Sequence, residues 1–341
     1  MIRDLTWTGN QFLAPETQSA DFFAAVHAVD LTTKDDVWSE RVALDLAAHH
    51  GLRPEFVKVG AGATQLIDVL LRALHRGPVV DVTPNFHLTA TVARREGWEY
   101  LAVPVRDPDG LLPGLEPFLD RDDVVFSLSS PRNPLGYQFP LDDIARLLDR
   151  TRCPVLLDEV YADFAPATAM RLTEQYENLV VVRTFSKAWG LANLRIGFAV
   201  SALFAPPGPA LPLLPNSVAG VAQRAARHLL AHPGPVRESI AAAQEGRARL
   251  VAALERIPGL HVWPSDANYV CLETPLAGDV VSALAGIGYP VRLVNTLKGY
   301  PPDWPPGVRI TVPPQPGADA VVAAISRVLA RTARDAEPVV G

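Results

Sequence analysis

The segment NLVVVRTFSKAWGLANLRIGFAV, residues 178–200, decides the fold of this chain. It predicts two short apolar strands, and it places a lysine, Lys187, between them among hydroxyl side chains. The chain has only four lysines in 341 residues, and an arginine, Arg195, follows this one eight residues later. Taken alone, the segment favours a solvated surface lysine, which is the usual place for this residue. The surrounding sequence must show whether Lys187 belongs to a site.

Short apolar runs alternate with helical patterns on both sides of this segment, from about residue 40 to residue 230. Several runs are apolar almost throughout, as in strands that are buried on both faces of a sheet. Strands are predicted at residues 56–60, 78–84, 99–105, 123–130, 154–160, 178–184 and 195–200, and helices at 63–77, 87–97 and 141–150. The alternation predicts an α/β fold with a mostly parallel seven-stranded sheet.

A different pattern follows in the C-terminal third. A long helical region at 217–257, broken near residues 231–235, leads into a mixture of short strands and helices. The strands are predicted at 260–265, 267–273, 289–294 and 308–312, and the helices at 278–287 and 317–334. We therefore expect three parts: an N-terminal arm over 1–35, a large α/β domain over 36–230, and a smaller α+β domain over 231–341.

Composition narrows the class of function. The net charge is −6 and no long basic run occurs, which argues against nucleic acid and anionic membranes as partners. The N-terminus lacks the pattern of a secretory signal, and prolines interrupt the weakly polar stretch at 204–215, which argues against a membrane helix. Cys153 and Cys271 are expected to be small buried residues, and the histidines show no metal-binding spacing. We expect a cytoplasmic protein without a metal.

The turn after the first predicted strand is suited to an anion. In VKVGAGATQL, a glycine-containing turn joins a strand to a helix and presents backbone N–H groups at the helix start. Gly60 and Gly62 fit a dinucleotide fingerprint, but Gln65 stands at its third glycine position, so that pattern fails. The amides of Ala63 and Thr64 and the Thr64 hydroxyl are the candidate phosphate donors.

Four more turns carry polar or aromatic residues that are candidates for a binding site. Each of these residues also has an ordinary structural explanation. Phe86 could be an aromatic residue of the core, and Asn133, which stands between prolines, could serve only to form a turn. Asp158 follows an apolar run, where a carboxylate is costly unless it has a cationic partner, and Tyr161 lies three residues on. The fifth turn holds the residues of the opening segment: Thr184, Ser186, Lys187 and Arg195. Ligands bind at the carboxyl ends of strands in such sheets, so all five turns together predict one site.

Pyridoxal phosphate is the small molecule that uses the whole set. Its aldehyde requires a lysine amine, and its pyridine nitrogen requires a carboxylate that keeps the ring protonated and electron-withdrawing. Its phosphate is suited to helix-terminal N–H groups, hydroxyls and an arginine, and its flat ring to an aromatic neighbour.

The motifs SPRNPLG, DEVY, TFSKAWGLANLRIG, PSDANY and VRITV resemble, in order and spacing, those of fold-type I pyridoxal-phosphate aminotransferases of class I/II. The chain is most similar to the histidinol-phosphate aminotransferase branch, with threonine-phosphate decarboxylase as a relative, from about residue 36 to the end. The resemblance implies transamination between an amino acid or amino-phosphate and a 2-oxo acid, in a homodimer. It implies that Lys187 attaches the cofactor, that Asp158 pairs with the ring nitrogen, that Phe86 stacks on the ring, and that Tyr161 and Asn133 hold the ring's phenolic oxygen. It places the phosphate on Ala63, Thr64, Thr184, Ser186 and Arg195, and the substrate on Arg309, Arg292 and Asn10.

The sequence departs from the family pattern at four places, of which one, the proline-rich 204–215, lies next to the expected substrate entrance. Residues 63–65 read Ala-Thr-Gln where the family usually has Ser-Asp-Glu, and Leu135 replaces a usual threonine. Trp38 stands where a tyrosine usually reaches the partner subunit's cofactor, and the proline-rich 204–215 replaces a helix. A specialised biosynthetic role, a decarboxylase or an amine-oxidising enzyme therefore stay open as alternatives. A non-catalytic regulator is disfavoured by the acidic charge and by the presence of Lys187, Asp158 and Arg195.

Overall fold

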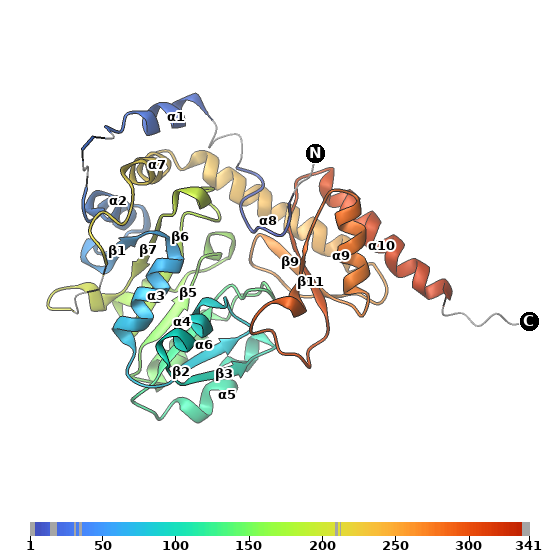
Figure 1. The fold of residues 1–341 in the computed structure, drawn as a ribbon, viewed down its shortest axis with the longest axis horizontal. Helices are drawn as coiled ribbons and strands as arrows, with labels where there is room; N and C mark the ends of the chain where they lie inside the picture. The colour runs from blue at the N-terminus through green and yellow to red at the C-terminus, as the bar shows by residue number, and fades with distance from the viewer. Residues whose placement is uncertain are drawn as a thin grey trace, which may run out of the picture.

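The computed structural model describes residues 4–13, 19–30, 32–33, 36–208, 211 and 213–335, with the side chains of 331–335 left out. Of the four lysines, Lys34 lies outside these ranges. Two sheets organise the described chain, and the long helix α8, Gly234–Leu254, runs from one to the other (Figure 1).

The larger sheet has seven strands in the order β1-β7-β6-β5-β4-β2-β3. All of them are parallel to one another except β7, which lies antiparallel between β1 and β6. The seven predicted strands and the mostly parallel sheet are thus confirmed. The strands are β1 Val57–Gly60, β2 Val79–Thr83, β3 Tyr100–Pro104, β4 Val125–Ser129, β5 Val155–Asp158, β6 Leu179–Thr184 and β7 Gly197–Val200.

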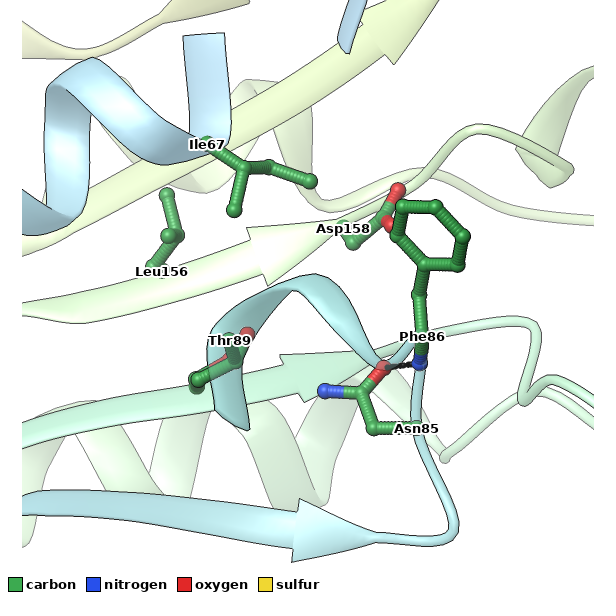
Figure 2. Close-up of a pocket in the computed structure, with 7 residues that line it drawn as sticks. Ile67, Asn85, Phe86, Thr89, Leu156 and Asp158 are labelled. Carbon is green, nitrogen blue, oxygen red and sulfur yellow. Dashed lines mark hydrogen bonds between the residues drawn. The ribbon is translucent and has the colours of Figure 1, made fainter. Parts of the chain in front are cut away.

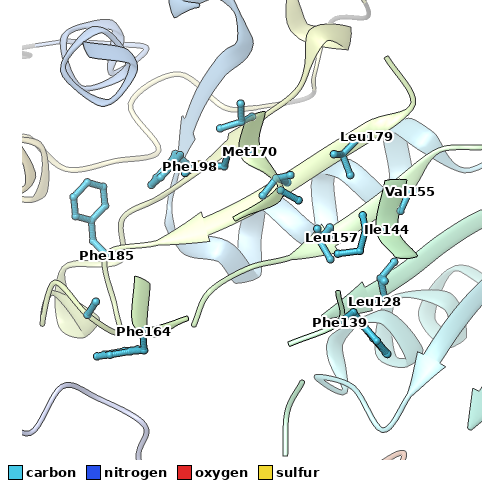
Figure 3. Close-up of a cluster of buried hydrophobic side chains, with 14 of the residues drawn as sticks. Leu128, Phe139, Ile144, Val155, Leu157, Phe164, Met170, Leu179, Phe185 and Phe198 are labelled. Carbon is cyan, nitrogen blue, oxygen red and sulfur yellow. The ribbon is translucent and has the colours of Figure 1, made fainter. Parts of the chain in front are cut away.

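Apolar side chains cover both faces of this sheet, which explains the continuous apolar runs in the sequence. In β6, Leu179 and Val181 join the cluster on one face, and Val180 and Val182 join the cluster on the other. Figure 3 shows the first cluster, in which Leu157 lies beside Ile144 and Phe198 lies beside Met170. The faces are packed by helices α2 Glu40–His50, α3 Gly62–Leu74, α4 Leu88–Glu96, α5 Leu111–Leu115, α6 Leu141–Arg150 and α7 Gly220–Ala231.

The proline-rich segment 204–215 forms no α-helix among its described residues, as its sequence predicts. Between β7 and α7, the described residues form one short 3₁₀ turn, Ala202–Phe204, and no α-helix. Proline removes a backbone donor and clashes with the preceding helical turn, so a run of prolines prevents a helix here. The predicted break near 231–235 is also confirmed, because α7 ends at Ala231 and α8 begins at Gly234.

The smaller sheet is antiparallel, in the order β10-β11-β9-β8. The edge strands are shorter than predicted, since β8 covers only His261–Val262 and β10 only Arg292–Leu293. The central strands β9, Tyr269–Glu273, and β11, Gly307–Thr311, are fully buried under α9, Ala277–Gly286, and α10, Gly317–Asp335. Leu5 from the N-terminus packs into this second core, beside Leu250 and Ile310. The predicted domain boundaries at 36 and 231 stay a prediction.

In the part of the chain that the structure describes, no helix is both long and apolar enough to cross a bilayer.

Candidate active site

The carboxyl ends of four neighbouring strands gather most of the predicted site residues. Asp158 is the last residue of β5 and Thr184 the last of β6, while Asn133 follows β4 and Phe86 follows β2. These strands lie side by side in the order β6-β5-β4-β2, and parallel strands place their carboxyl ends at the same edge of the sheet. The fold therefore brings together side chains that are far apart in the sequence.

Asp158 is a buried carboxyl group, with only 8% of the residue exposed. Its Oδ1 accepts a hydrogen bond of 3.0 Å from the Val160 amide. Burial raises the pKa of Asp158 to about 6, and the charge of Lys187 acts in the opposite direction. Figure 2 shows the Phe86 ring beside the Asp158 carboxyl group, at the rim of a pocket that Leu156 and Ile67 also line. The pocket thus offers a carboxyl group beneath an aromatic face.

A buried polar chain under the β2 loop holds the backbone of Phe86. The Phe86 amide donates to Asn85 Oδ1 at 2.7 Å, and Asn85 Nδ2 donates to Asp81 Oδ1 at 2.7 Å. Tyr100 donates to the other oxygen of Asp81, also at 2.7 Å. Burial raises the pKa of Asp81 to about 6. The sequence offered a signal for this group, an aspartate inside the apolar strand VVDVT, but it was not among the predicted site residues.

Lys187 is held from the N-terminal arm. Its Nζ donates to Thr8 Oγ1 at 2.6 Å and lies 5.2 Å from the centre of the Tyr161 ring. The Thr8 hydroxyl also lies 2.8 Å from the Tyr161 hydroxyl. Three polar groups from the arm, the β5 loop and the β6 loop therefore meet at one point. Sequence reasoning missed Thr8, because a lone threonine in an irregular arm carries no local pattern.

An ion network behind the site fixes the ends of β5 and β6. Glu159 and Arg183 are almost fully buried and their side chains meet at 3.2 Å. Arg183 also pairs with Asp163 at 2.5 Å, and Glu159 accepts the Ala169 amide at 2.6 Å. Buried charges need partners, and both carboxylates are paired with Arg183, although its Nε has no hydrogen-bond partner in the described structure. Glu159 and Arg183 neighbour Asp158 and Thr184 in the chain. The network thus fixes the backbone that carries the site.

The start of α3 lies beside the guanidinium of Arg195. Gln65 Oε1 accepts the amide of the N-cap residue, Ala61, at 2.6 Å, but Ala61 itself makes no side-chain cap to the amides that follow it. A Cβ added to Gly62, whose φ is +82°, would stand 2.8 Å from Arg195 Nη2, so the guanidinium lies against the helix start. No carboxylate among the described residues pairs with Arg195. Across the site, Thr184 donates to Ser186 Oγ at 3.0 Å.

The smaller sheet contributes two arginines. Arg309 is 7% exposed, and it donates to Asn133 Oδ1 and to the Thr6 carbonyl, each at 2.8 Å. Its Nε has no hydrogen-bond partner in the described structure. Arg292, which is exposed, lies directly opposite Arg309 in the β10–β11 ladder. The two guanidinium groups therefore start from adjacent positions on the same face.

Asn10, which is predicted to contact substrate, makes hydrogen bonds to other residues of the chain. Its Nδ2 donates to the Ala188 carbonyl and to Ser239 Oγ, each at 2.9 Å, and its Oδ1 accepts the Phe12 amide at 3.0 Å. It ties the N-terminal arm to the residue that follows Lys187. Its proposed contact with substrate stays a prediction.

The sequence pattern of the family described as aminotransferase class I and II matches residues 40–325, most of the chain. The chain belongs to the class I and II aminotransferases. This aminotransferase is 30% identical to the histidinol-phosphate aminotransferase of Thermococcus kodakarensis over 307 residues, which cover 87% of this chain and 84% of the relative.

Two solved structures share the fold of this aminotransferase. One is the histidinol-phosphate aminotransferase of Sinorhizobium meliloti in complex with pyridoxal 5'-phosphate, with a TM-score of 0.79, 22% identity and coverage of 96% of this chain and 91% of that one. The other is the L-threonine-O-3-phosphate decarboxylase of Porphyromonas gingivalis, with a TM-score of 0.77, 20% identity and coverage of 96% and 100%. At these identities the likeness describes the fold.

Pyridoxal 5'-phosphate is the cofactor of this aminotransferase, and the residues present fit it. The start of α3 beside Arg195 is suited to a phosphate, because backbone amides at a helix start and a guanidinium are both donors that phosphate oxygens accept. Asp158 is a buried carboxyl group whose charge is costly until a cation pairs with it, and a protonated ring nitrogen is such a cation. Lys187 carries an amine, the group that forms a covalent link with an aldehyde.

Proposed function

We propose that this aminotransferase acts on a primary amine that carries a distal phosphate or carboxylate, with a 2-oxo acid as the second substrate. The observation that carries the proposal is the position of Arg309, which reaches Asn133 from the small sheet while Arg292 lies opposite it. Arginine's planar fork binds carboxylate and phosphate in a bidentate manner, which lysine cannot copy. The T. kodakarensis relative, a histidinol-phosphate aminotransferase, supports a substrate of this kind.

The proposed cofactor site uses the predicted residues. Arg195, Thr184, Ser186, Ala63 and Thr64 would hold the phosphate. Phe86 would lie against one face of the ring, with Asp158 at the ring nitrogen and Asn133 and Tyr161 at the phenolic oxygen. When bound there, pyridoxal phosphate supplies an aldehyde for a covalent link and a ring that stabilises negative charge at the substrate's Cα.

In the proposed mechanism, the chain's own groups position and move protons. Lys187, as a neutral amine, would take the proton from the substrate's Cα and return it at the carbon that comes from the cofactor's aldehyde group. Asp158 stays ionised and holds the proton on the ring nitrogen, where the charge is needed. Arg309 binds the substrate's anionic end and so orients the Cα–H bond toward Lys187.

The homodimer and the cytoplasmic location belong to the same proposal. An exposed apolar surface that includes Trp38 and Leu214 supports a second copy of the chain as partner. The two cysteines, Cys153 and Cys271, are buried and free, which supports a reducing location.

The substrate is tested by half-reactions of the purified holoenzyme. Histidinol phosphate, threonine phosphate and amino acids of varied charge are mixed with it in turn, and absorbance records conversion of the cofactor from its aldehyde to its amine form. We expect conversion with anionic amines, a keto product in equal amount, and a KM that Arg309→Lys raises about 10- to 100-fold.

Two outcomes would contradict the proposal. Release of carbon dioxide in place of a keto acid would assign a decarboxylase, as in the P. gingivalis structure with the same fold. Equal KM values for the Arg309→Lys and Arg292→Lys variants and the unmodified enzyme would mean that neither arginine binds substrate.

A further inference from the structure

The N-terminal arm, residues 4–13, is pinned on both sides of Thr8. Before it, Thr311 Oγ1 lies 2.9 Å from both the Leu5 and the Trp7 carbonyl oxygens, so its one proton can bond to either of them. After it, Asn268 Nδ2 donates to the carbonyls of Thr8 and Gly9, each at 3.0 Å. The backbone of Thr8 is therefore fixed by groups other than its own hydroxyl. Its side chain occupies its place independently of the contacts that the hydroxyl makes.

The Thr8 hydroxyl is buried at the centre of the site. The residue is 3% exposed, and its oxygen lies 2.6 Å from Lys187 Nζ and 2.8 Å from the Tyr161 hydroxyl. A threonine oxygen has two acceptor positions and one proton, so it can accept from the lysine while it exchanges a second hydrogen bond with the tyrosine. Its β-branched side chain is stiff at χ1, so the hydroxyl has little freedom to turn away.

Among the described residues, Thr8 is the only hydrogen-bond acceptor for Lys187 Nζ. Asp158 is the charged group that acts on Lys187 electrostatically, but the only hydrogen bond of the Nζ within the described ranges is the one to Thr8. A long, flexible lysine side chain loses much conformational freedom when it is held in one position. A single short hydrogen bond from a rigid arm is a direct means of doing so.

We propose that Thr8 is a positioning residue of this aminotransferase, which holds the free amine of Lys187 in one place and ties it to Tyr161. The proposal rests on the proposed role of Lys187. When Lys187 takes the Cα proton, the amine becomes an ammonium group, and one of its N–H bonds donates to Thr8 Oγ1. The proton stays on the lysine until it returns to carbon, so Thr8 neither gains nor loses one. Thr8 acts by position and by accepting this hydrogen bond.

The test compares Thr8→Val with Thr8→Ser. Valine keeps the shape and removes the hydroxyl, whereas serine keeps the hydroxyl and removes the methyl group. The first readout needs no turnover: cofactor is removed from the full chain, pyridoxal phosphate is added back, and covalent attachment is followed by borohydride trapping over time. The second readout is kcat against KM in the half-reaction with whichever amine the unmodified enzyme uses.

We expect Thr8→Val to slow attachment and to lower kcat about tenfold or more with little change in KM, and Thr8→Ser to stay close to the unmodified enzyme. A valine variant that attaches cofactor and turns over at the unmodified rate would overturn the proposal. So would equal losses in both variants, because the hydroxyl would then not be the cause. If circular dichroism shows the valine variant unfolded, Thr8→Ala is measured in its place under the same criteria.

The two proposals fail differently. An unmodified chain that neither binds pyridoxal phosphate covalently nor transfers an amino group would refute the proposed function itself. Normal behaviour of the unmodified chain together with unchanged Thr8→Val kinetics would refute the role of Thr8 alone.

Discussion

At the residue scale, Asp158 is a carboxyl group held in an unfavourable place. It is buried, its pKa is raised to about 6, and one backbone amide is the hydrogen-bond donor that the structure gives it. A carboxylate in such a position is stabilised when a cation is brought to it. A protonated ring nitrogen of the cofactor is such a cation.

The charge of Asp158 is expected to matter more than its shape. Asp158→Asn keeps the side chain's size but removes the negative charge that holds the ring proton. The loss of one such electrostatic contact is worth on the order of 2.7–4 kcal/mol in the transition state, so kcat should fall about 100- to 1000-fold. Steady-state kinetics test this, with cofactor content measured in parallel. Near-normal turnover in a variant that holds cofactor would refute the assignment.

The raised pKa of Asp158 makes the free energy of unfolding of the cofactor-free chain depend on pH. The carboxyl group titrates near 3.8 when unfolded and near 6 when folded, so between these values the folded chain holds a proton that the unfolded chain has released. Its contribution to stability is full below 3.8 and is lost as the pH rises through 6. Denaturant unfolding of the unmodified chain and of Asp158→Asn should therefore diverge by on the order of 1–3 kcal/mol between pH 4 and pH 7. A constant difference across that range would count against a raised pKa.

How far residues can be predicted from sequence depends on whether they sit in a local pattern. Asp158, Lys187 and Asn133 each follow an apolar run that predicts a strand. Because parallel strands end at the same edge of a sheet, the sequence predicts that these residues lie together. Thr8 and Asp81 could not be assigned in this way. Thr8 reaches the site through a long-range contact from an irregular arm, and Asp81 lies inside a strand, not at its end.

At the element scale, the anion site depends on how closely β7 and Arg195 approach the start of α3. A Cβ on Gly197 would stand 2.8 Å from the Ala63 amide nitrogen, and one on Gly62 would stand 2.8 Å from Arg195 Nη2. Both glycines thus permit a close approach, and Gly62 also takes a positive φ that other residues rarely adopt. The helix start and the guanidinium share one small volume because there is no side chain between them.

Gly62→Ala is therefore expected to weaken cofactor binding. The added methyl group displaces Arg195 from the helix start, which should cost one charge-assisted contact of about 1.5–3 kcal/mol, or roughly 10- to 100-fold in affinity for pyridoxal phosphate. Gly259→Ala is the matched control, because Gly259 has φ +78° and no atom within 4 Å of an added Cβ. Fluorescence titration measures both. Equal affinities in the two variants would show that Arg195 does not depend on this space.

Elements were predictable where burial was complete. The central strands of both sheets are fully buried, and their mainly apolar runs located them although Asp81, Arg183 and Arg309 lie within them. The edge strands β8 and β10 have only two residues each. An edge strand has a partner on one side only, so its length depends on that partner. The antiparallel direction of β7 could not be predicted either, since an apolar run reports burial and not direction.

At the scale of the whole molecule, an apolar surface remains uncovered around α2 and the segment before α7. Trp38 is 53% exposed and Leu214 68%, and both line a cleft of about 320 Å³ that reaches Lys58 in β1. Leu44 on α2 is 54% exposed as well. Such a patch is typical of an interaction surface, and a second copy of the chain is the proposed partner.

Trp38→Asp is expected to shift the protein from dimer to monomer. A charge at the centre of an apolar interface must be buried without a partner, which opposes association. Ile287→Asp serves as the control, because this exposed apolar residue follows α9 at the opposite end of the molecule (Figure 1). Sedimentation velocity distinguishes the states. A monodisperse, fully active monomer of the unmodified chain would contradict the proposed dimer.

The most direct test of the whole account is the identity of the lysine that carries the cofactor. The chain has four candidates, and the site that we describe depends on one of them, Lys187, beside Thr8 and Asp158. The purified protein is saturated with pyridoxal phosphate, reduced with borohydride, digested and mapped by mass spectrometry. We expect the label on Lys187, in the peptide that holds TFSKAWG. A label on Lys34, Lys58 or Lys298 with Lys187 unmodified would contradict the site at the carboxyl edge of the sheet.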